Sequence, residues 1–249
     1  MPRVKPHVEL LACTPNMQNL IAMAAKVCYS ASNIEQLQKR IQRSDQEAFI
    51  QGLVEMGHMS PIEHASFTFA IEGVSRTFLA QITRHRLASF SVQSQRYVSM
   101  RGEETFDYIL PERIAELGEE MTNKFHEQMR TMQTWYNEWL DILGDSPSGG
   151  REDARFVLPG ASATRMLVTM NVRELYHFFS LRCCNRAQWE IREVAWEMLR
   201  LCKKEAPFLF KDAGPDCLHG ACTQGKMSCG KAAEVRRRAE EMQNDGSEE

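Results

Sequence analysis

Alternating apolar residues between Ala65 and Ile71 restrict the fold of this chain more than any other pattern in it. Apolar side chains occupy every second position of this segment, which is the period of a half-buried β-strand. Most other apolar patterns repeat at helical spacing, and the longest of them runs over residues 112–143. A chain that contains both periods, with helices predominating, predicts a mixed α/β (α+β) fold.

The same patterns predict two more strands and several helices. The strands are predicted over residues 7–13 and 164–170. Ser75 is placed to cap a short helix, and Asn171 and Glu174 have the spacing of a capping box that opens another helix. Further helices are predicted over residues 16–29, 45–56, 152–158 and 186–205.

The composition of the chain changes after Pro207. Large apolar side chains are common before it and rare after it, and the chain ends in a charged segment. We therefore predict one domain over residues 1–210 and an irregular, cysteine-containing tail over residues 211–249. The chain has 249 residues, of which 43% are hydrophobic, so it is long enough to bury a sizeable core.

The sequence has no segment typical of a membrane-spanning or secreted protein. No apolar run approaches the ~18 residues that span a bilayer, and the N-terminal apolar stretch is too short for a signal peptide. We therefore expect a cytoplasmic protein without a membrane partner. The formal net charge of −3 argues against a protein that coats nucleic acid, because that function needs a strong cationic field.

The segment from Gly73 to Gly102 has an unusual charge composition. It contains five arginines and one histidine, but no Asp, Glu or Lys. A guanidinium forms two parallel hydrogen bonds to a phosphate, and no carboxylate within the segment competes for it. Serines and glutamines between the arginines can orient a base or a ribose. The segment therefore favours a phosphorylated ligand, while a solvated basic loop and arginines paired with distant acids are the alternatives.

The same segment carries a family signature. The triplet 84–86 reads Arg-His-Arg, and it is followed after seven residues by Ser94 and then by Arg96 and Tyr97. This arrangement resembles the signature of flavin-dependent thymidylate synthases, and Gln81 precedes the triplet at the spacing of that family. Other segments that resemble the family lie at residues 57–64, 155–159, 171–173, 181–182 and 187–190. The resemblance extends over roughly residues 8–210.

The resemblance implies an activity, a cofactor and a set of ligands. The family methylates dUMP at C5 to give dTMP without an enzyme nucleophile. Methylenetetrahydrofolate supplies the carbon, and FAD that has been reduced by NADPH supplies the hydride. Members are homotetramers whose active sites combine residues from more than one subunit. For this chain the resemblance thus implies FAD, these three small-molecule ligands and a homotetramer. Separately, we expect neither a nucleic-acid partner nor a bound metal.

Eight positions match the flavin contacts of the family. They are Ser60, Glu63, Arg84, His85, Arg86, Asn171, Arg173 and His177. The family often has an amide at the position of His177, so this contact departs from the pattern. Ser60 and Glu63 also have the spacing of a capping box, which is a purely structural alternative. His58 matches a family histidine that guides the folate or a proton near the flavin ring; a plain histidine at a helix end is the alternative.

Seven positions match the dUMP contacts of the family. They are Gln81, Arg84, Ser94, Gln95, Arg96, Arg155 and Arg182. The resemblance implies catalytic roles for Arg84, Arg182 and His58. A cation beside the uracil, such as Arg84, stabilises the negative charge that develops as C5 becomes nucleophilic.

Ser94 is of a residue type that can serve as a nucleophile when a base activates it. Its neighbours Gln93 and Gln95 are not bases, so we assign Ser94 to phosphate or ribose binding. Val92 stands where some members of the family have an acid or an amide. If that position contacts dUMP, the contact in this chain comes from the main chain or from Gln93.

The cysteines of the tail offer a different interpretation. The candidate metal ligands are Cys202, Cys217, His219, Cys222 and Cys229. Their residue types suit zinc, but their spacing lacks the tight C-x2-C pair that makes a zinc assignment strong, so free or redox-active thiols are the alternative. The competing function classes are a redox or metal-sensing protein built around these cysteines and a nucleic-acid-binding module that uses the arginine-rich segment.

Overall fold

A computed structural model describes residues 4–244 of the chain. This part of the chain folds into two units. Unit 1 comprises residues 4–7, 70–84 and 90–167, and unit 2 comprises residues 8–69, 85–89 and 168–244. Each strand of the sheet crosses a boundary between these ranges, so both units contain part of every strand.

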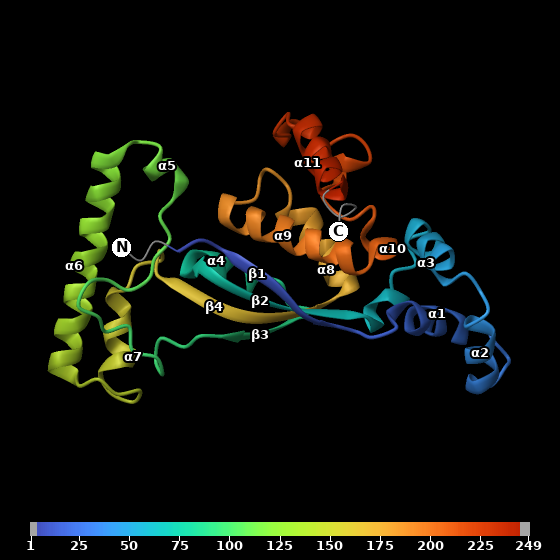
Figure 1. The fold of residues 1–249 in the computed structure, drawn as a ribbon, viewed down its shortest axis with the longest axis horizontal. Helices are drawn as coiled ribbons and strands as arrows, with labels where there is room; N and C mark the ends of the chain where they lie inside the picture. The colour runs from blue at the N-terminus through green and yellow to red at the C-terminus, as the bar shows by residue number, and fades with distance from the viewer. Residues whose placement is uncertain (1–3, 245–249) are drawn as a thin grey trace. The chain divides into compact units, whose positions relative to one another are not determined.

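A four-stranded sheet has the strand order β1-β2-β4-β3 (Figure 1). The strands are β1 (His7–Cys13), β2 (Ser66–Ser75), β3 (Ala88–Val92) and β4 (Ala163–Asn171). β1, β2 and β4 confirm the three strands predicted from the sequence. The sequence patterns do not predict β3, because it is only five residues long and lies in the arginine-rich segment.

Unit 2 contains helices from both halves of the chain. They are α1 (Met17–Val27), α2 (Ile34–Ile41), α3 (Gln46–Glu55), α8 (Val172–Arg182), α9 (Trp189–Glu205), α10 (Pro207–Phe210) and α11 (Ala232–Asn244). Short 3-10 turns lie at Pro61–His64, Asp216–Leu218 and Gly225–Met227. α9 packs against α8 and α10, and α1 packs against α2 and α3 (Figure 1).

Phe210 joins distant segments in the core of unit 2. Its ring packs edge-on against Phe67 of β2, with 5.4 Å between centroids, and against Phe179 of α8, with 6.1 Å. Tyr176 of α8 stacks on the same ring at 5.8 Å. Burial of one such ring stabilises the fold by about 1.5–3 kcal/mol. The last residue of the predicted domain is therefore fixed by the core.

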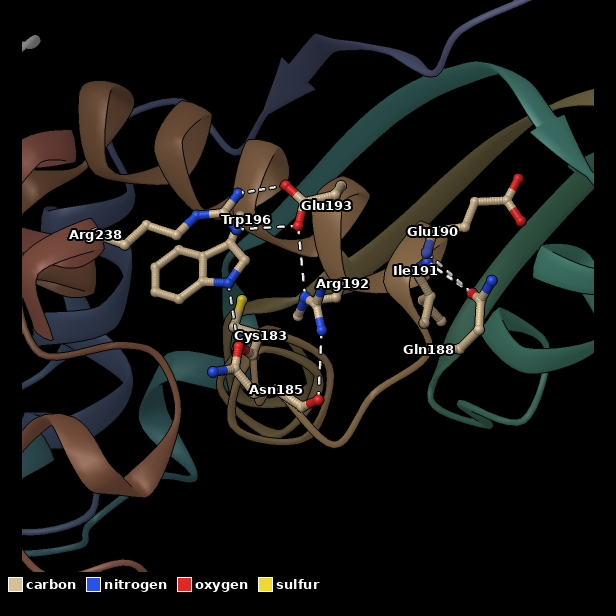
Figure 2. A network of polar contacts seen from close by, with 9 residues as sticks. All are labelled: Cys183, Asn185, Gln188, Glu190, Ile191, Arg192, Glu193, Trp196 and Arg238. Atoms are coloured by element: carbon tan, nitrogen blue, oxygen red, sulfur yellow. Dashed lines mark hydrogen bonds and ion pairs between the residues drawn. The ribbon is translucent and has the colours of Figure 1, made fainter. Parts of the chain in front are cut away.

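The tail is more regular than the sequence predicts. Residues 232–244 form α11, on which Val235 and Ala239 are buried one turn apart. Arg238 forms a two-point ion pair with Glu193 of α9, at 3.0 and 2.6 Å, and lies 4.8 Å from the centre of the Trp196 ring (Figure 2). A narrow apolar stripe and Arg238 thus hold α11 against α9, and the composition of the tail does not predict this helix. Residues 245–249 of the tail lie outside the described residues, and the domain boundary at 210 stays a prediction.

Unit 1 contains the longest helix. Its helices are α4 (Arg76–Ile82), α5 (Glu112–Ala115), α6 (Glu119–Leu143) and α7 (Gly150–Ala154), with a 3-10 turn at Arg155–Val157. The Ser75 hydroxyl accepts a hydrogen bond from the Phe78 amide at 2.9 Å, which confirms the predicted cap of α4. The helix predicted over 112–143 is interrupted at Gly118, whose φ of 99° favours glycine. α6 packs against α5 and α7 (Figure 1).

These elements confirm the predicted mixed α/β fold. Within residues 4–244, no helix has both the length and the apolar character that crossing a membrane requires.

Candidate functional site

The predicted site residues divide between the two units. Those in unit 2 are His58, Ser60, Glu63, His85, Arg86, Asn171, Arg173, His177 and Arg182. Those in unit 1 are Gln81, Arg84, Ser94, Gln95, Arg96 and Arg155. All predicted flavin contacts except Arg84 therefore lie in unit 2, and all predicted dUMP contacts except Arg182 lie in unit 1.

His85 is buried in unit 2 and bonds to two side chains of α8. Its Nδ1 lies 2.7 Å from Oε1 of Glu174, and its Nε2 lies 3.1 Å from Nε of Arg182. A guanidinium only donates, so Nε2 accepts this bond and carries no proton. The proton of the neutral ring is therefore on Nδ1, which donates to the carboxylate. The two partners together define one tautomer of His85.

The surroundings of His85 keep its ring neutral. Burial lowers the pKa of His85, the hydrogen bond to Glu174 opposes this effect, and the charge of Arg182 adds to the lowering. The ring also packs edge-on against Phe178, with 5.0 Å between centroids, and lies 5.7 Å from the ring of His177. The net effect lowers the pKa below its ordinary value, so His85 is uncharged at neutral pH.

Glu174 has a role beyond the helix cap that the sequence predicts for it. The Asn171 side chain does accept a hydrogen bond from the Glu174 amide at 2.9 Å, which confirms Asn171 as the N-cap of α8. The Glu174 carboxylate, however, bonds to His85, 89 positions away. The sequence signal for the burial of Glu174 is its position one turn before Phe178, on a helix face whose other residues are apolar.

Glu63 and Arg173 form an ion pair in unit 2. Both were predicted flavin contacts, and the structure brings them together. The side chain of Ser60 makes no capping hydrogen bond, and the Glu63 carboxylate faces Arg173, so the capping-box alternative for this pair is wrong. Glu63 balances the charge of Arg173, which leaves this arginine less available to an anionic ligand than an unpaired one.

Arg84 and Arg86 follow α4 in the chain, and both side chains are exposed. Among the side chains of residues 4–244, no carboxylate forms an ion pair with either guanidinium. Arg96 and Arg101 of the same segment do pair with acids outside it, Glu152 and Asp141. The alternative of distant acid partners therefore holds for these two arginines, but not for Arg84 and Arg86.

Ser94 begins a tight turn in unit 1. Its hydroxyl oxygen accepts hydrogen bonds from the amides of Arg96, at 3.1 Å, and Tyr97, at 3.4 Å. In the described part of the chain, no histidine or carboxylate bonds to this hydroxyl. The oxygen is thus occupied as an acceptor, while its hydrogen is available to an anionic oxygen of a ligand.

Glu152 links two of the predicted dUMP contacts. Its carboxylate lies 3.6 Å from Nε of Arg96, and its carbonyl oxygen accepts a hydrogen bond from Nε of Arg155 at 3.0 Å. The side-chain nitrogen of Gln95 is buried and has no hydrogen-bond partner among the described residues. A buried donor without a partner is costly, and a ligand oxygen would satisfy it.

Arg76 belongs to the arginine-rich segment but was not assigned to the site. One of its terminal nitrogens donates to the carbonyl oxygen of Gln93 at 2.8 Å, while its Nε is buried and has no partner within residues 4–244. Burial and the nearby charge of Arg155 lower the pKa of Arg76. Two neighbouring guanidiniums repel each other, and an anion bound between them would relieve the repulsion.

Two cavities are lined by few or none of the predicted site residues. One, of about 530 Å³ in unit 1, is lined in part by Gln93, Ser99 and Arg165 and contains none of the predicted dUMP contacts. The other, of about 740 Å³ in unit 2, is lined by aromatic and aliphatic side chains together with Lys26, Arg40 and His58. His58 is exposed and follows α3, so its position at a helix end is as expected.

Among residues 4–244, no three of the candidate zinc ligands of the tail lie within 4.8 Å of one another, so their role stays a prediction. In the described part of the chain, the one group of three potential ligands with metal-like spacing is His85, Glu174 and His177, and it includes no cysteine. Burial raises the pKa of the Cys202 and Cys217 thiols, whereas a hydrogen bond with Ser228 lowers the pKa of Cys222. His219 bonds through Nε2 to the carbonyl oxygen of Asp212 at 2.9 Å.

Within residues 4–244, arginines without ion-pair partners and buried donors without acceptors, on a mixed α/β fold, suit the binding of phosphorylated small molecules. Comparison with known proteins defines the family. The family model described as "Thymidylate synthase complementing protein" matches residues 9–208. The flavin-dependent thymidylate synthase of Geobacter sulfurreducens is 48% identical over 94% of this chain and 98% of its own. That of Pyrococcus furiosus is 40% identical over 88% of this chain and 89% of its own.

The chain therefore belongs to the flavin-dependent thymidylate synthase family, and it is a methyltransferase of thymidylate biosynthesis. A solved structure of the UMP/dUMP methylase PolB from Streptomyces cacaoi, bound with 5-Br dUMP, has a similar fold. The TM-score is 0.68 at 24% identity, over 84% of this chain and 94% of that chain.

Proposed function

We propose that this enzyme converts dUMP to dTMP with FAD as cofactor, methylenetetrahydrofolate as carbon donor and NADPH as reductant. The observation that carries the proposal is the family match over residues 9–208, which includes the whole arginine-rich segment. The flavin supplies the hydride chemistry, and the protein supplies binding, orientation and charge.

The residues of unit 2 suit a flavin dinucleotide. Its diphosphate needs cations that no carboxylate neutralises, and Arg86 meets that requirement, as does Arg84 at the end of the unit 1 segment. Arg173 contributes less charge, because it is paired with Glu63. The exposed ring of His177 lies beside the buried ring of His85 and offers a polar edge to the ligand.

The residues of unit 1 suit the phosphate and sugar of dUMP. Arg155 supplies positive charge, and Arg96 supplies less because it is paired with Glu152. Ser94 supplies a hydroxyl donor, and Gln95 supplies an amide donor that has no partner among the described residues. Charge-assisted hydrogen bonds of this kind contribute about 1.5–3 kcal/mol each. Because no described base bonds to the Ser94 oxygen, we assign Ser94 to binding and propose a reaction without an enzyme nucleophile.

Arg84 of unit 1 and Arg182 of unit 2 are each proposed as uracil contacts. We assign both to the uracil, where a cation stabilises the negative charge that develops on the ring as C5 becomes nucleophilic. Neither residue holds or transfers a proton in this scheme, because a guanidinium stays protonated. His58 is exposed, and we assign it to the folate or to proton transfer.

We also propose that the enzyme is a cytoplasmic homotetramer whose active sites combine residues from more than one subunit. Light scattering coupled to size-exclusion chromatography measures the mass directly. We expect four times the 28.6 kDa of the chain, and a stable monomer that is fully active would contradict shared sites.

Flavin spectroscopy tests the cofactor assignment. We expect purified protein to be yellow, or to become yellow on incubation with FAD, and NADPH to bleach the bound flavin more readily when dUMP is present. Protein that is colourless and gains no flavin on incubation contradicts the proposed function.

A further inference from the structure

We propose that Glu174 is a positioning residue of this enzyme. Its carboxylate fixes the tautomer of His85, and His85 in turn holds the guanidinium of Arg182. The roles of His85 and Arg182 toward flavin and dUMP rest on the proposed function, whereas the arrangement of the three side chains does not.

The three side chains form one chain of hydrogen bonds inside unit 2. Glu174 lies in the first turn of α8, and Arg182 is the last residue of the same helix. His85 bridges them, with 2.7 Å from Nδ1 to the carboxylate and 3.1 Å from Nε2 to the Arg182 Nε. A change at Glu174 therefore reaches Arg182 through both nitrogens of one ring.

Burial protects the hydrogen bond between Glu174 and His85 from water. The side chains of His85 and Glu174 are only 3% and 6% exposed, so water cannot replace either partner. The Glu174 amide is held by Asn171 at 2.9 Å, and the first turn of a helix favours a negative charge. The carboxylate is consequently held in place and accepts the Nδ1 proton of His85.

The tautomer of His85 decides whether its ring can accept a hydrogen bond from Arg182. Arg182 can donate to Nε2 only while that nitrogen has no proton. Without the carboxylate, the ring can place its proton on Nε2, where it faces the donor of Arg182 and the bond is lost. Glu174 thus maintains the contact of His85 with Arg182, without touching the substrate.

A metal ion is the competing explanation for this cluster. One ligand atom each from His85, Glu174 and His177 lie within 4.8 Å of one another, which is metal-like spacing. However, the proton on Nδ1 of His85 points at the Glu174 carboxylate, so neither atom is available to a metal. Arg182 donates to Nε2 and places a positive charge beside the cluster. A divalent cation would have to displace the proton and approach that charge, so the hydrogen-bonded arrangement is favoured.

Nitrogen-15 NMR of histidine-labelled protein without added ligands tests the tautomer. In wild-type protein we expect the His85 ring to carry its proton on Nδ1. The tautomer should persist in Glu174→Gln, whose amide oxygen can still accept the bond, and should be lost in Glu174→Ala. A proton on Nε2 in the wild type, or the same tautomer in all three proteins, would overturn the proposal. So would a shift typical of metal-bound His85 on addition of Zn²⁺.

Kinetics with dUMP test the consequence for Arg182. We expect Glu174→Ala to lower kcat/KM about 10- to 100-fold, which corresponds to one charge-assisted hydrogen bond, and Glu174→Gln to recover part of this loss. Since Glu174 acts through His85, adding Glu174→Ala to His85→Asn should cause little further loss. Fully additive losses would contradict action through His85.

A matched control separates positioning from stability. Glu193→Gln removes another carboxylate of unit 2, one that pairs with Arg238 and not with His85. We expect it to lower thermal stability and to leave kcat/KM unchanged. If Glu174→Ala does not fold, the wild-type tautomer and the Glu174→Gln kinetics still decide the question. If the wild type makes no dTMP, the proposed function fails while the NMR result stands by itself.

Discussion

Ser94 is of a residue type that can act as a nucleophile, but its surroundings do not activate it. Its oxygen accepts two backbone hydrogen bonds, and in the described part of the chain no base bonds to it. We expect Ser94→Ala to raise the KM for dUMP about 10-fold, because one hydrogen bond to the phosphate or ribose is lost, and to retain turnover. Steady-state kinetics with flavin and dUMP titrations measure both effects. Complete loss of turnover with normal binding of both ligands would show that Ser94 is the nucleophile.

Arg86 has an exposed guanidinium without an ion-pair partner within residues 4–244. We expect Arg86→Gln to weaken FAD binding about 10-fold or more, because a charge-assisted bond to the diphosphate is lost, and the difference to shrink at high salt. Fluorescence titration of the flavin measures the Kd. Arg113→Gln, at an exposed arginine of α5, is the matched control and should bind FAD as the wild type does. Equal Kd values for both variants would remove Arg86 from the flavin site.

Residue-scale predictions from the sequence succeeded where the relevant contact is local. Ser75 and Asn171 cap their helices as predicted, because each cap involves an amide three positions away. The Glu174–His85 and Glu63–Arg173 pairs join residues 89 and 110 positions apart, and no local pattern reveals such pairs. The predicted flavin and dUMP contacts themselves stay predictions.

At the scale of elements, the cap of α4 can be tested directly. The hydroxyl of Ser75 is buried and accepts the Phe78 amide hydrogen bond. We expect Ser75→Ala to lower the free energy of unfolding by about 1 kcal/mol, because the amide loses its acceptor. Urea unfolding followed by circular dichroism measures the change, and Ser75→Thr should retain most of the stability. Equal midpoints for Ser75→Ala and the wild type would show that the cap contributes nothing.

The docking of α11 on α9 should depend on pH. Burial acts to raise the pKa of Glu193, but its contacts with Arg238 and Arg192 outweigh burial and lower the pKa below its ordinary value (Figure 2). A lowered carboxyl pKa stabilises the folded state above the unfolded-state pKa of about 4.3, and this stabilisation disappears as the pH falls through the folded-state value. Glu193→Gln should therefore cost about 1 kcal/mol at neutral pH, because the pair is partly exposed, and little in strong acid.

Thermal unfolding at neutral and acidic pH measures this difference. A loss of about 1 kcal/mol lowers the Tm by roughly 2–4 °C in a chain of this size. Glu197→Gln is the matched control, since among residues 4–244 Glu197 pairs with Arg200 of the same helix, and its loss should change the Tm less. A Tm difference between Glu193→Gln and the wild type that stays the same in strong acid would contradict the ion pair as its cause.

Elements were predictable where they are long and strongly periodic. β1, β2 and β4 have clear alternation, and α9 has a long apolar face, so the sequence alone predicts them. β3 is only five residues long and lies within an arginine-rich segment, and α11 buries only a narrow stripe. Both depend on the surface against which they pack, which is a tertiary property that local periodicity does not contain.

At the scale of the whole molecule, the distribution of charge matters more than its total. The net charge of −3 conceals the segment 73–102, which has five arginines and no acid. The structure divides the predicted residues further, with most flavin contacts in unit 2 and most dUMP contacts in unit 1. The sequence order could not reveal this division, because each unit is assembled from segments that lie far apart in the chain.

Release of tritium from dUMP labelled at C5 tests the central claim most directly, since methylation must replace the C5 hydrogen. With FAD, NADPH and methylenetetrahydrofolate present, we expect tritium to enter water at the rate at which dTMP forms. Omission of the folate should abolish dTMP formation. Protein that has bound flavin but releases no tritium from the complete mixture would contradict the proposed reaction.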